Sequence, residues 1–305
     1  MNSNKILIIG SQGFIGSAIC NYFLKKGFDV VGCDIVDKSE NCSYYYHKIT
    51  SDLSNDLVKI FAEHQFQLCI NAAGSGNVPL SVENPLLDFK ANVADVISIL
   101  DAIKLHNSSC KYLHISSAAV YGNPEKLPVC ENDLTQPVSP YGYHKLMSES
   151  ICKEYYKLFG LKTAIIRPFS VYGAGLKKQL FWDLCQKISK SESNKIELFG
   201  TGEESRDFIY INDLVELIYL INAKDNFECS IYNAASGIET KINQLASIIQ
   251  PFFPTKKIAF SGQSRIGDPN NWVADISKSK SIGFANKVAI ETGIEKYIEW
   301  FKHLQ

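Results

Sequence analysis

A tyrosine and a lysine four residues apart are the first candidates for chemistry. Tyr141 and Lys145 bound the stretch Tyr-Gly-Tyr-His-Lys. On a helix, residues i and i+4 share one face, so the ammonium can lie beside the phenol. A free phenol has a pKa of about 10 and is a poor base, but a nearby positive charge stabilises the phenolate. The pair predicts acid–base chemistry by Tyr141, whereas Tyr143 has no lysine four residues later and is excluded.

Three glycines indicate where a dinucleotide binds. Gly10, Gly13 and Gly16 lie between a predicted strand and a predicted helix, with one residue more between the first two glycines than the common fingerprint has. Glycines there let the chain turn tightly and bring backbone N–H groups against a pyrophosphate. Asp34 ends the next strand, where a carboxylate can bind the adenosine ribose. No arginine follows Asp34 to receive a 2′-phosphate, so NAD is predicted rather than NADP.

A serine completes the candidate catalytic set. Ser117 directly follows the strand predicted over residues 111–116. The carboxyl ends of parallel strands form the ligand crevice of an α/β sheet. A hydroxyl there can hydrogen-bond the oxygen of a carbon that undergoes hydride transfer. Ser117, Tyr141 and Lys145 are therefore the predicted catalytic residues.

The elements that position these residues alternate along the first half of the chain. Apolar runs bounded by turn residues alternate with longer amphipathic stretches, which predicts an α/β fold: a Rossmann-type doubly wound parallel sheet with helices on both faces. Strands are predicted over residues 5–9, 28–33, 44–48, 66–71, 111–116 and 161–166, and helices over 14–26, 53–64, 85–106 and 140–159.

The alternation breaks after Arg167, where glycines become frequent. A strand and a helix within residues 207–223 are expected to rejoin the large domain. The NAD-binding domain is predicted over residues 1–170 and 206–224. A smaller, discontinuous α/β substrate-binding lobe is predicted over residues 171–205 and 225–305.

Composition limits the class of protein. Hydrophobic residues make up 46% and charged residues 21%, and the formal net charge is −1. This balance gives no reason to expect nucleic acid or a membrane as a partner. Neither a signal peptide nor an apolar run of about 20 residues is present, so a cytoplasmic protein is expected. The nine cysteines show no Cys-x-x-Cys spacing, so neither a disulfide framework nor a metal site is expected.

The glycine turn, Asp34, Ser117, Tyr141 and Lys145, in this order and spacing, resemble the extended short-chain dehydrogenase/reductase family. More narrowly, they resemble its NAD-dependent epimerase/dehydratase branch, which acts on nucleotide sugars (UDP-galactose 4-epimerase-like). The resemblance runs over almost the whole chain.

The resemblance implies further cofactor contacts. The pair Asp52 and Leu53 resembles the one that contacts adenine, and the segment from Asn71 resembles a strand end beside the pyrophosphate. The full set of implied cofactor residues is Gly10, Gly13, Phe14, Ile15, Gly16, Asp34, Asp52, Leu53, Ala72, Ala73, Asn92, Lys145 and Pro168.

The resemblance also assigns the three arginines. Arg167 looks structural, whereas Arg206 and Arg265 resemble two arginines that bind the substrate diphosphate through charge-assisted hydrogen bonds. Asp268 would face the nucleotide ribose or the arginine. The implied substrate-binding residues are Ser117, Tyr141, Ser170, Arg206, Arg265 and Asp268.

Departures from the family pattern narrow the reaction. Family members that eliminate water carry an Asp-Glu pair directly after the catalytic serine, where this chain has Ala118 and Ala119. A methyl group cannot move protons, which counts against a 4,6-dehydratase and also against decarboxylating members. Ser170 stands where many epimerases carry asparagine, which leaves the sugar open.

The leading hypothesis is a nucleotide-sugar epimerase acting at carbon 4 through a transient 4-keto sugar, with hydride passed to and from bound NAD. The close alternative is a 4-keto-sugar reductase or a 4-dehydrogenase with net hydride transfer. The remote alternative is a non-catalytic dinucleotide-sensing module, against which the presence of both Tyr141 and Lys145 counts. The resemblance further suggests a homodimer formed through the helices predicted over residues 85–106 and 140–159.

Overall fold

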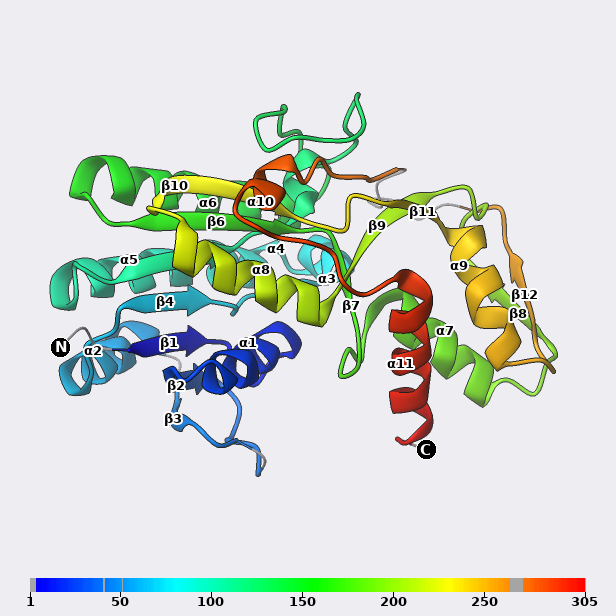
Figure 1. Ribbon diagram of the computed structural model, residues 1–305, viewed down its shortest axis with the longest axis horizontal. Helices are drawn as coiled ribbons and strands as arrows, with labels where there is room; N and C mark the ends of the chain where they lie inside the picture. Colours follow the sequence, from blue (N-terminus) through cyan, green and yellow to red (C-terminus); the bar gives the residue numbers. More distant parts are fainter. Residues whose placement is uncertain (1–3, 41, 51, 264–270, 305) are drawn as a thin grey trace.

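A parallel sheet of seven strands forms the centre of the molecule (Figure 1). The computed structural model describes residues 4–40, 42–50, 52–263 and 271–304. The sheet contains β1 (Lys5–Ile9), β2 (Asp29–Asp34), β3 (Tyr45–Lys48), β4 (Leu68–Asn71), β5 (Lys111–Ile115), β6 (Thr163–Pro168) and β10 (Glu228–Ala234), in the order β3-β2-β1-β4-β5-β6-β10. All adjacent strands run parallel, which confirms the predicted fold class.

Helices cover both faces of this sheet. On one face lie α1 (Phe14–Lys25) and α8 (Ile211–Lys224); on the other lie α2 (Leu53–Glu63), α5 (Asp95–His106) and α6 (Pro140–Phe159). Alternate residues of one strand enter different cores: Ile6 and Ile8 pack toward α1 and α8, whereas Leu7 and Ile9 pack toward α2 and α5. Burial on both faces explains why these strands are continuously apolar.

Helix α6 has the bounds that the sequence predicts. Its N-cap is Ser139, whose hydroxyl accepts a hydrogen bond from the Gly142 N–H at 3.2 Å, and Pro140 occupies the first turn. Gly160 ends the helix in the left-handed conformation, with φ of 70°. The cap and the terminal glycine explain why both ends could be predicted.

The helix predicted over residues 85–106 is interrupted. After α3 (Val78–Glu83), α4 (Pro85–Phe89) passes through a π-helical turn (Lys90–Ala94) into α5. A π turn adds a residue to the backbone ring, a local change that the apolar periodicity did not show. It contains Asn92, one of the implied cofactor residues.

A second group of elements lies beside the sheet, at the right of Figure 1. It contains a three-stranded sheet of β7 (Ser170–Tyr172), β9 (Ser205–Tyr210) and β11 (Glu239–Lys241), and a two-stranded sheet of β8 (Lys195–Leu198) and β12 (Lys257–Phe260). The accompanying helices are α7 (Gln179–Lys190), α9 (Ile242–Ile249), the 3-10 turn Gln250–Phe252 and α11 (Ile290–Lys302). The short α10 (Ser277–Ser281) instead lies beside β10.

One predicted domain boundary is wrong. The sequence assigned residues 225–305 to the smaller lobe, but β10 pairs with β6 and is the seventh strand of the large sheet. The first residues of β10 are exposed or half-buried, and the pairing shifts register between Glu228 and Ser230. This edge strand therefore lacks the apolar run by which the inner strands were found. The helix in the 207–223 segment packs beside α1 on the large sheet, as α8, but the strand of this segment does not rejoin that sheet. It is part of β9, which pairs with β7 and β11 in the smaller sheet, so the assignment of residues from 206 to the large domain is also wrong.

Within the described residues, no helix combines the length and the apolar character needed to cross a membrane.

Candidate active site

The glycine turn between β1 and α1 packs closely on itself and on the backbone that follows β4. Gly10 has φ of 79°, and a Cβ on it would lie 2.6 Å from the backbone nitrogen of Ala73. A Cβ on Gly16 would lie 2.0 Å from the carbonyl oxygen of Gly10. Gly13 is the N-cap of α1. Because it has no side chain, the first backbone N–H groups of α1, from Phe14 onward, receive no hydrogen bond from a capping side chain. The turn therefore fits a pyrophosphate.

Asp34 lies at the carboxyl end of β2, next to this turn. One carboxylate oxygen accepts a hydrogen bond from the backbone N–H of Gln12 at 2.9 Å, and the other accepts from that of Ile35 at 2.7 Å. These bonds fix the carboxylate beside the turn while the side chain stays partly exposed. This position suits a carboxylate that binds an adenosine ribose.

The other implied cofactor residues also follow strand ends or begin helices. Asp52 is exposed at the start of α2, where its side chain accepts a hydrogen bond from the Asn55 N–H at 3.2 Å; Leu53 is the next residue. The backbone N–H of Ala73 donates to the Asn71 side chain at 3.1 Å. Ala72 lies between them, directly after β4.

Asn92 carries a buried polar atom that fits a ligand. Its amide nitrogen donates to the carbonyl oxygen of Ser75 at 3.2 Å, but its Oδ1 atom is buried and has no partner among the described residues. A Cβ on Gly74 would lie 2.5 Å from this Oδ1 atom, so the glycine keeps the space beside it open. A buried acceptor normally has a hydrogen-bond partner, so this atom fits a donor from the bound cofactor.

The structure brings Ser117, Tyr141 and Lys145 together. Ser117 follows β5 and caps the 3-10 turn η2 (Ala118–Tyr121), accepting from the Ala119 N–H at 3.1 Å. The Ser117 hydroxyl lies near enough to the Tyr141 phenol to act on its pKa, and the Lys145 Nζ atom lies 6.0 Å from the centre of the Tyr141 ring. Tyr143, by contrast, is half exposed.

A glycine allows this approach of α6 to the serine turn. A Cβ on Gly142 would lie 2.7 Å from the carbonyl oxygen of Ala119 and 3.0 Å from the Cβ atom of Pro137. Any larger residue at 142 would push α6 away from η2. Gly142 therefore sets the separation between Ser117 and Tyr141.

Burial dominates the electrostatics of this set. Desolvation raises the pKa of Tyr141 to about 12, against the lowering effect of the Ser117 hydrogen bond, and the charge of Asp88 adds to the increase. Desolvation lowers the pKa of Lys145 to about 8, while the carboxylates of Asp88 and Glu149 act to raise it. At neutral pH the phenol of the free site is therefore protonated and the lysine is mostly charged.

Neighbouring groups hold the tyrosine and the lysine in place. The Lys145 Nζ atom donates to the carbonyl oxygen of Ile115 at 3.0 Å, and the Tyr141 N–H donates to the Ser81 hydroxyl at 3.2 Å. The Asp88 carboxylate lies 2.6 Å from the Nδ1 atom of His144, and both residues are buried. Sequence reasoning missed Ser81 and Asp88, which reach Tyr141 from distant parts of the chain, and it missed His144, whose partner is the distant Asp88.

A buried ion pair fixes α6 to the sheet. Arg167 on β6 binds both carboxylate oxygens of Glu149, at 2.9 and 2.6 Å, and the Ser116 hydroxyl donates to the same carboxylate at 2.6 Å. Arg167 is structural, as the sequence suggested. Glu149 was missed, although its spacing of four from Lys145 places both on one helical face.

Two of the predicted substrate residues, Ser170 and Arg206, lie on neighbouring strands of the smaller sheet. Ser170 begins β7, beyond Pro168, an implied cofactor residue at the end of β6, and β7 pairs with β9, which carries Arg206. The Arg206 guanidinium lies 5.8 Å from the centre of the Trp272 ring. Arg265 and Asp268 lie outside the described residues.

Trp272 connects this arginine to the serine turn and was missed by sequence reasoning. Its indole N–H donates to the carbonyl oxygen of Gly122 at 3.0 Å, directly after η2, and its ring packs edge-on against Phe169 at 5.7 Å. A lone tryptophan in an irregular segment carries no spacing signal, so only the fold shows its place.

The match to a family model decides the family. Residues 6–235 match the model of the NAD dependent epimerase/dehydratase family. The chain belongs to this family. It is therefore an NAD-dependent enzyme, and the glycine turn, Asp34 and the Asn92 acceptor fit the cofactor.

Relatives match along the full length of this family member. A putative UDP-glucose 4-epimerase of Methanocaldococcus jannaschii is 31% identical over 98% of each chain. The structure of the UDP-glucose 4-epimerase of Thermotoga maritima with UDP-glucose has a TM-score of 0.89 and 26% identity, covering 99% of this chain and 100% of that one. The structure of UDP-glucuronic acid 4-epimerase from Bacillus cereus, in complex with UDP-glucuronic acid and NAD, has a TM-score of 0.88 and 27% identity, with the same coverage.

Proposed function

We propose that this enzyme is an NAD-dependent epimerase that inverts carbon 4 of a nucleotide-diphosphate sugar. The convergence of Ser117, Tyr141 and Lys145 at the carboxyl edge of the sheet carries this proposal. The 4-epimerases among its relatives and structural neighbours support the position of the reaction on the sugar.

The side chains of the site divide the acid–base work. The Tyr141 phenol oxygen takes the proton from the carbon-4 hydroxyl and returns it to the keto oxygen, and the Ser117 hydroxyl holds that oxygen in line. The Lys145 ammonium favours the phenolate and binds the nicotinamide ribose. When bound, NAD would supply the acceptor and donor of the carbon-4 hydride, and its positive charge would further favour the phenolate. The 4-keto sugar turns over between the two transfers, so that its other face is reduced.

The residues after Ser117 exclude the acid–base groups of a dehydratase. Ala118 is fully buried in η2 and Ala119 follows it, so neither position offers a carboxylate beside the substrate carbon. In this proposal Tyr141 carries the proton transfer, which suffices for oxidation and reduction at carbon 4, and positions 118 and 119 supply no further acid or base for the elimination of water.

The smaller lobe binds the nucleotide diphosphate in this proposal. Arg206 and Arg265 bind the diphosphate oxygens, Asp268 contacts the ribose or an arginine, and Ser170 lies on the sugar side. The contacts of Trp272 with the Arg206 guanidinium and with the Gly122 carbonyl oxygen support a binding surface next to the serine turn. The lobe comprises residues 170–210, which include β7 and β9, and the chain beyond β10, apart from α10, which packs beside β10.

The enzyme acts as a homodimer in this proposal. Helix α6 contacts both α4 and α5, and the three helices expose large apolar side chains: Leu86, Leu87, Phe89, Ile97, Leu105, Tyr143, Met147, Leu158 and Phe159. So much exposed apolar surface is typical of a protein interface.

The nine cysteines are all free, which suits the cytoplasm. In this proposal the enzyme serves carbohydrate biosynthesis there, without nucleic acid or membrane partners.

A product assay tests the function. The purified enzyme, with the NAD that it retains, is incubated with a panel of UDP-, CDP- and dTDP-sugars, and the products are separated by chromatography. The proposal expects carbon-4 epimers to form without accumulation or loss of NADH. A change in NADH equal to the product formed would instead identify a 4-keto-sugar reductase or a 4-dehydrogenase. No turnover of any nucleotide sugar, despite retained NAD, would identify a sensing module.

A further inference from the structure

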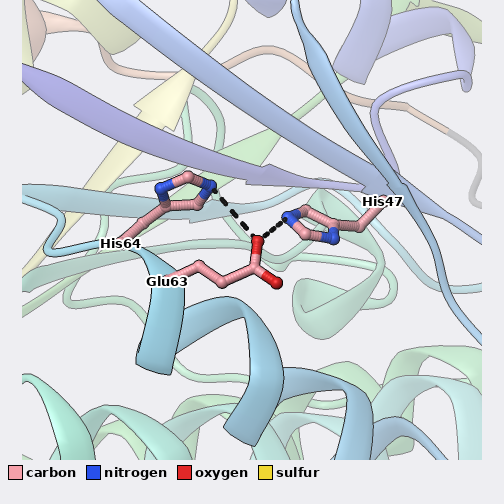
Figure 2. A group of neighbouring side chains, drawn as sticks. All are labelled: His47, Glu63 and His64. Atoms are coloured by element: carbon pink, nitrogen blue, oxygen red, sulfur yellow. Dashed lines mark ion pairs between the residues drawn. The ribbon is translucent and has the colours of Figure 1, made fainter.

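We propose that His47, Glu63 and His64 form a binding site for a divalent transition-metal ion, outside the active site. His47 lies on β3, the edge strand of the large sheet, and Glu63 and His64 lie at the end of α2. Figure 2 shows the Glu63 carboxylate between the two imidazole rings. One ligand atom from each residue lies within 4.8 Å of the other two. This site revises the sequence-based expectation of no metal.

The distances fit ligands around an ion better than direct hydrogen bonds. The Glu63 Oε2 atom lies 3.7 Å from the His47 Nε2 atom and 4.0 Å from the His64 Nε2 atom. Both distances exceed the hydrogen-bond range. Ligands at about 2.0–2.1 Å from a tetrahedral zinc ion lie about 3.4 Å apart, so the Glu63 carboxylate and the two imidazole rings would move slightly toward one another to bind it. Half of the Glu63 side chain is exposed, so it can make this movement.

Two buried nitrogen atoms lack partners at this site. The Nε2 atoms of His47 and His64 are both buried and have no hydrogen-bond partner among the described residues. Buried polar side-chain atoms are normally satisfied, and two orphaned imidazole nitrogens facing one carboxylate are unusual. A metal ion would satisfy both nitrogens at once.

Aromatic contacts already hold the two rings. Tyr45 packs edge-on against His47 at 4.9 Å and against His64 at 5.2 Å, and Phe66 packs against His64 at 5.7 Å. Rings that are held in place lose little conformational entropy when they bind a metal. Imidazole and carboxylate ligands favour zinc and its neighbours over magnesium or calcium. A water molecule would complete the coordination, and the ion would join β3 to α2.

Lys5 opposes metal binding and gives the site a specific signature. Its Nζ atom lies 3.3 Å from the Nδ1 atom of His64 and 3.4 Å from the Asp29 carboxylate. A lysine donates to Nδ1, which leaves the proton on Nε2, the nitrogen that must bind the metal. Metal binding therefore requires Lys5 to move toward Asp29 and the Nδ1 atom to take up the proton.

Metal titration of the full-length enzyme with its NAD bound tests this proposal. After treatment with a chelator, zinc binding is measured by calorimetry and cobalt binding by visible absorption. We expect one zinc ion whose affinity falls about 100-fold or more in Glu63→Gln, His47→Ala and His64→Ala. His106→Ala, which removes an exposed histidine at the end of α5, should bind zinc like the wild type. Saturating zinc should raise the melting temperature of the wild type by about 2 °C or more.

The outcomes separate this site from other metal binding. Equal zinc affinity in the wild type and in Glu63→Gln, whose exposed position makes misfolding no concern, would overturn the proposal. A cobalt complex with a thiolate charge-transfer band would overturn it too, because cysteine would then be the ligand.

Lys5→Gln should bind zinc severalfold more tightly than the wild type, since it removes the competing donor and a nearby positive charge. Unchanged or weaker binding in that variant would contradict the geometry.

Discussion

Burial shifts the pKa values of Tyr141 and Lys145 in opposite directions for the same reason. Removal from water disfavours the charged form of each group, so the phenol keeps its proton and the ammonium tends to lose one. In the free enzyme the catalytic base, Tyr141, is therefore present as the neutral phenol. Positive charge next to the phenol is then what the proposed reaction requires, and we propose that Lys145, whose Nζ atom lies 6.0 Å from the ring centre, supplies part of it.

Removing the phenol oxygen should stop proton transfer and little else. We expect Tyr141→Phe to lower kcat by about 10²–10⁴-fold, the usual size of acid–base catalysis, with the retained NAD unchanged. Rate measurements on the epimerisation, together with the amount of NAD released on denaturation, check this. Tyr143→Phe, at the half-exposed neighbour, should keep normal turnover, and near-normal turnover of Tyr141→Phe would remove Tyr141 from the mechanism.

Burial of the Lys145 ammonium should lower the free energy of unfolding of the enzyme. Because the folded pKa of this lysine, about 8, lies below the ordinary value of 10.5, the unfolded chain binds more protons between these values. Stability therefore increases as the pH rises from about 8 to 10.5, and the full cost applies below pH 8. We expect Lys145→Met to be inactive yet about 1–3 kcal/mol more stable at pH 7.

Urea unfolding at pH 7 and pH 10 measures this effect. The difference in the free energy of unfolding between Lys145→Met and the wild type should shrink at pH 10, where less of the desolvation cost of the wild-type lysine remains. An equal difference at both pH values would show that desolvation of the ammonium is not its source.

The approach of α6 to η2 depends on a single glycine. Alanine normally favours a helix over glycine by about 1 kcal/mol, but a Cβ at position 142 would lie 2.7 Å from the Ala119 oxygen. Overpacking of this kind costs about 1–3 kcal/mol, so the clash should dominate. We expect Gly142→Ala to be less stable and to lose about 10–100-fold in kcat, because Tyr141 moves away from Ser117.

A matched control lies at the other end of the same helix. Gly160 has φ of 70° and open space around it, so Gly160→Ala should cost about 1 kcal/mol through strain alone. Denaturation and steady-state kinetics on both variants separate stability from positioning. A similar loss of kcat in Gly160→Ala would contradict a specific role for residue 142.

Elements with strong local signals could be predicted, and those fixed by distant contacts could not. Helix α6 has its cap, its proline and its terminal glycine in the sequence, and the inner strands are continuously apolar. The π turn, the edge strand β10 and the Asp88–His144 pair carry no such local signal. The same holds for His47 and Glu63, which meet only because β3 lies beside the end of α2.

At the scale of the whole molecule, the fold brings the proposed cofactor-binding surface and the proposed substrate-binding surface together. The carboxyl edge of the sheet carries the glycine turn and Ser117, and the smaller lobe carries Arg206 on β9 (Figure 1). Trp272 lies between them through its contacts with Arg206 and Gly122. In our proposal the cofactor lies at the carboxyl edge of the sheet, the sugar of the substrate lies beside Ser117, and the diphosphate lies near the guanidinium of Arg206.

The apolar surface of α4, α5 and α6 should mediate dimerisation. We expect Met147→Glu to yield monomers, because a twofold interface would bury the introduced charge twice without a partner. Light scattering coupled to size-exclusion chromatography measures the mass. Leu134→Glu, at an even more exposed leucine outside these helices, should stay dimeric; a wild-type protein that is already monomeric would contradict the dimer.

The fate of the carbon-4 hydrogen tests the central claim most directly. A nucleotide sugar labelled with deuterium at carbon 4, chosen from those that the enzyme converts, is incubated with the enzyme and the NAD that it retains. Oxidation and reduction of one molecule in one site predicts that the epimeric product keeps the deuterium at carbon 4. Loss of the label to water, or its appearance in released NADH, would contradict epimerisation by Ser117, Tyr141 and Lys145 acting on a retained cofactor.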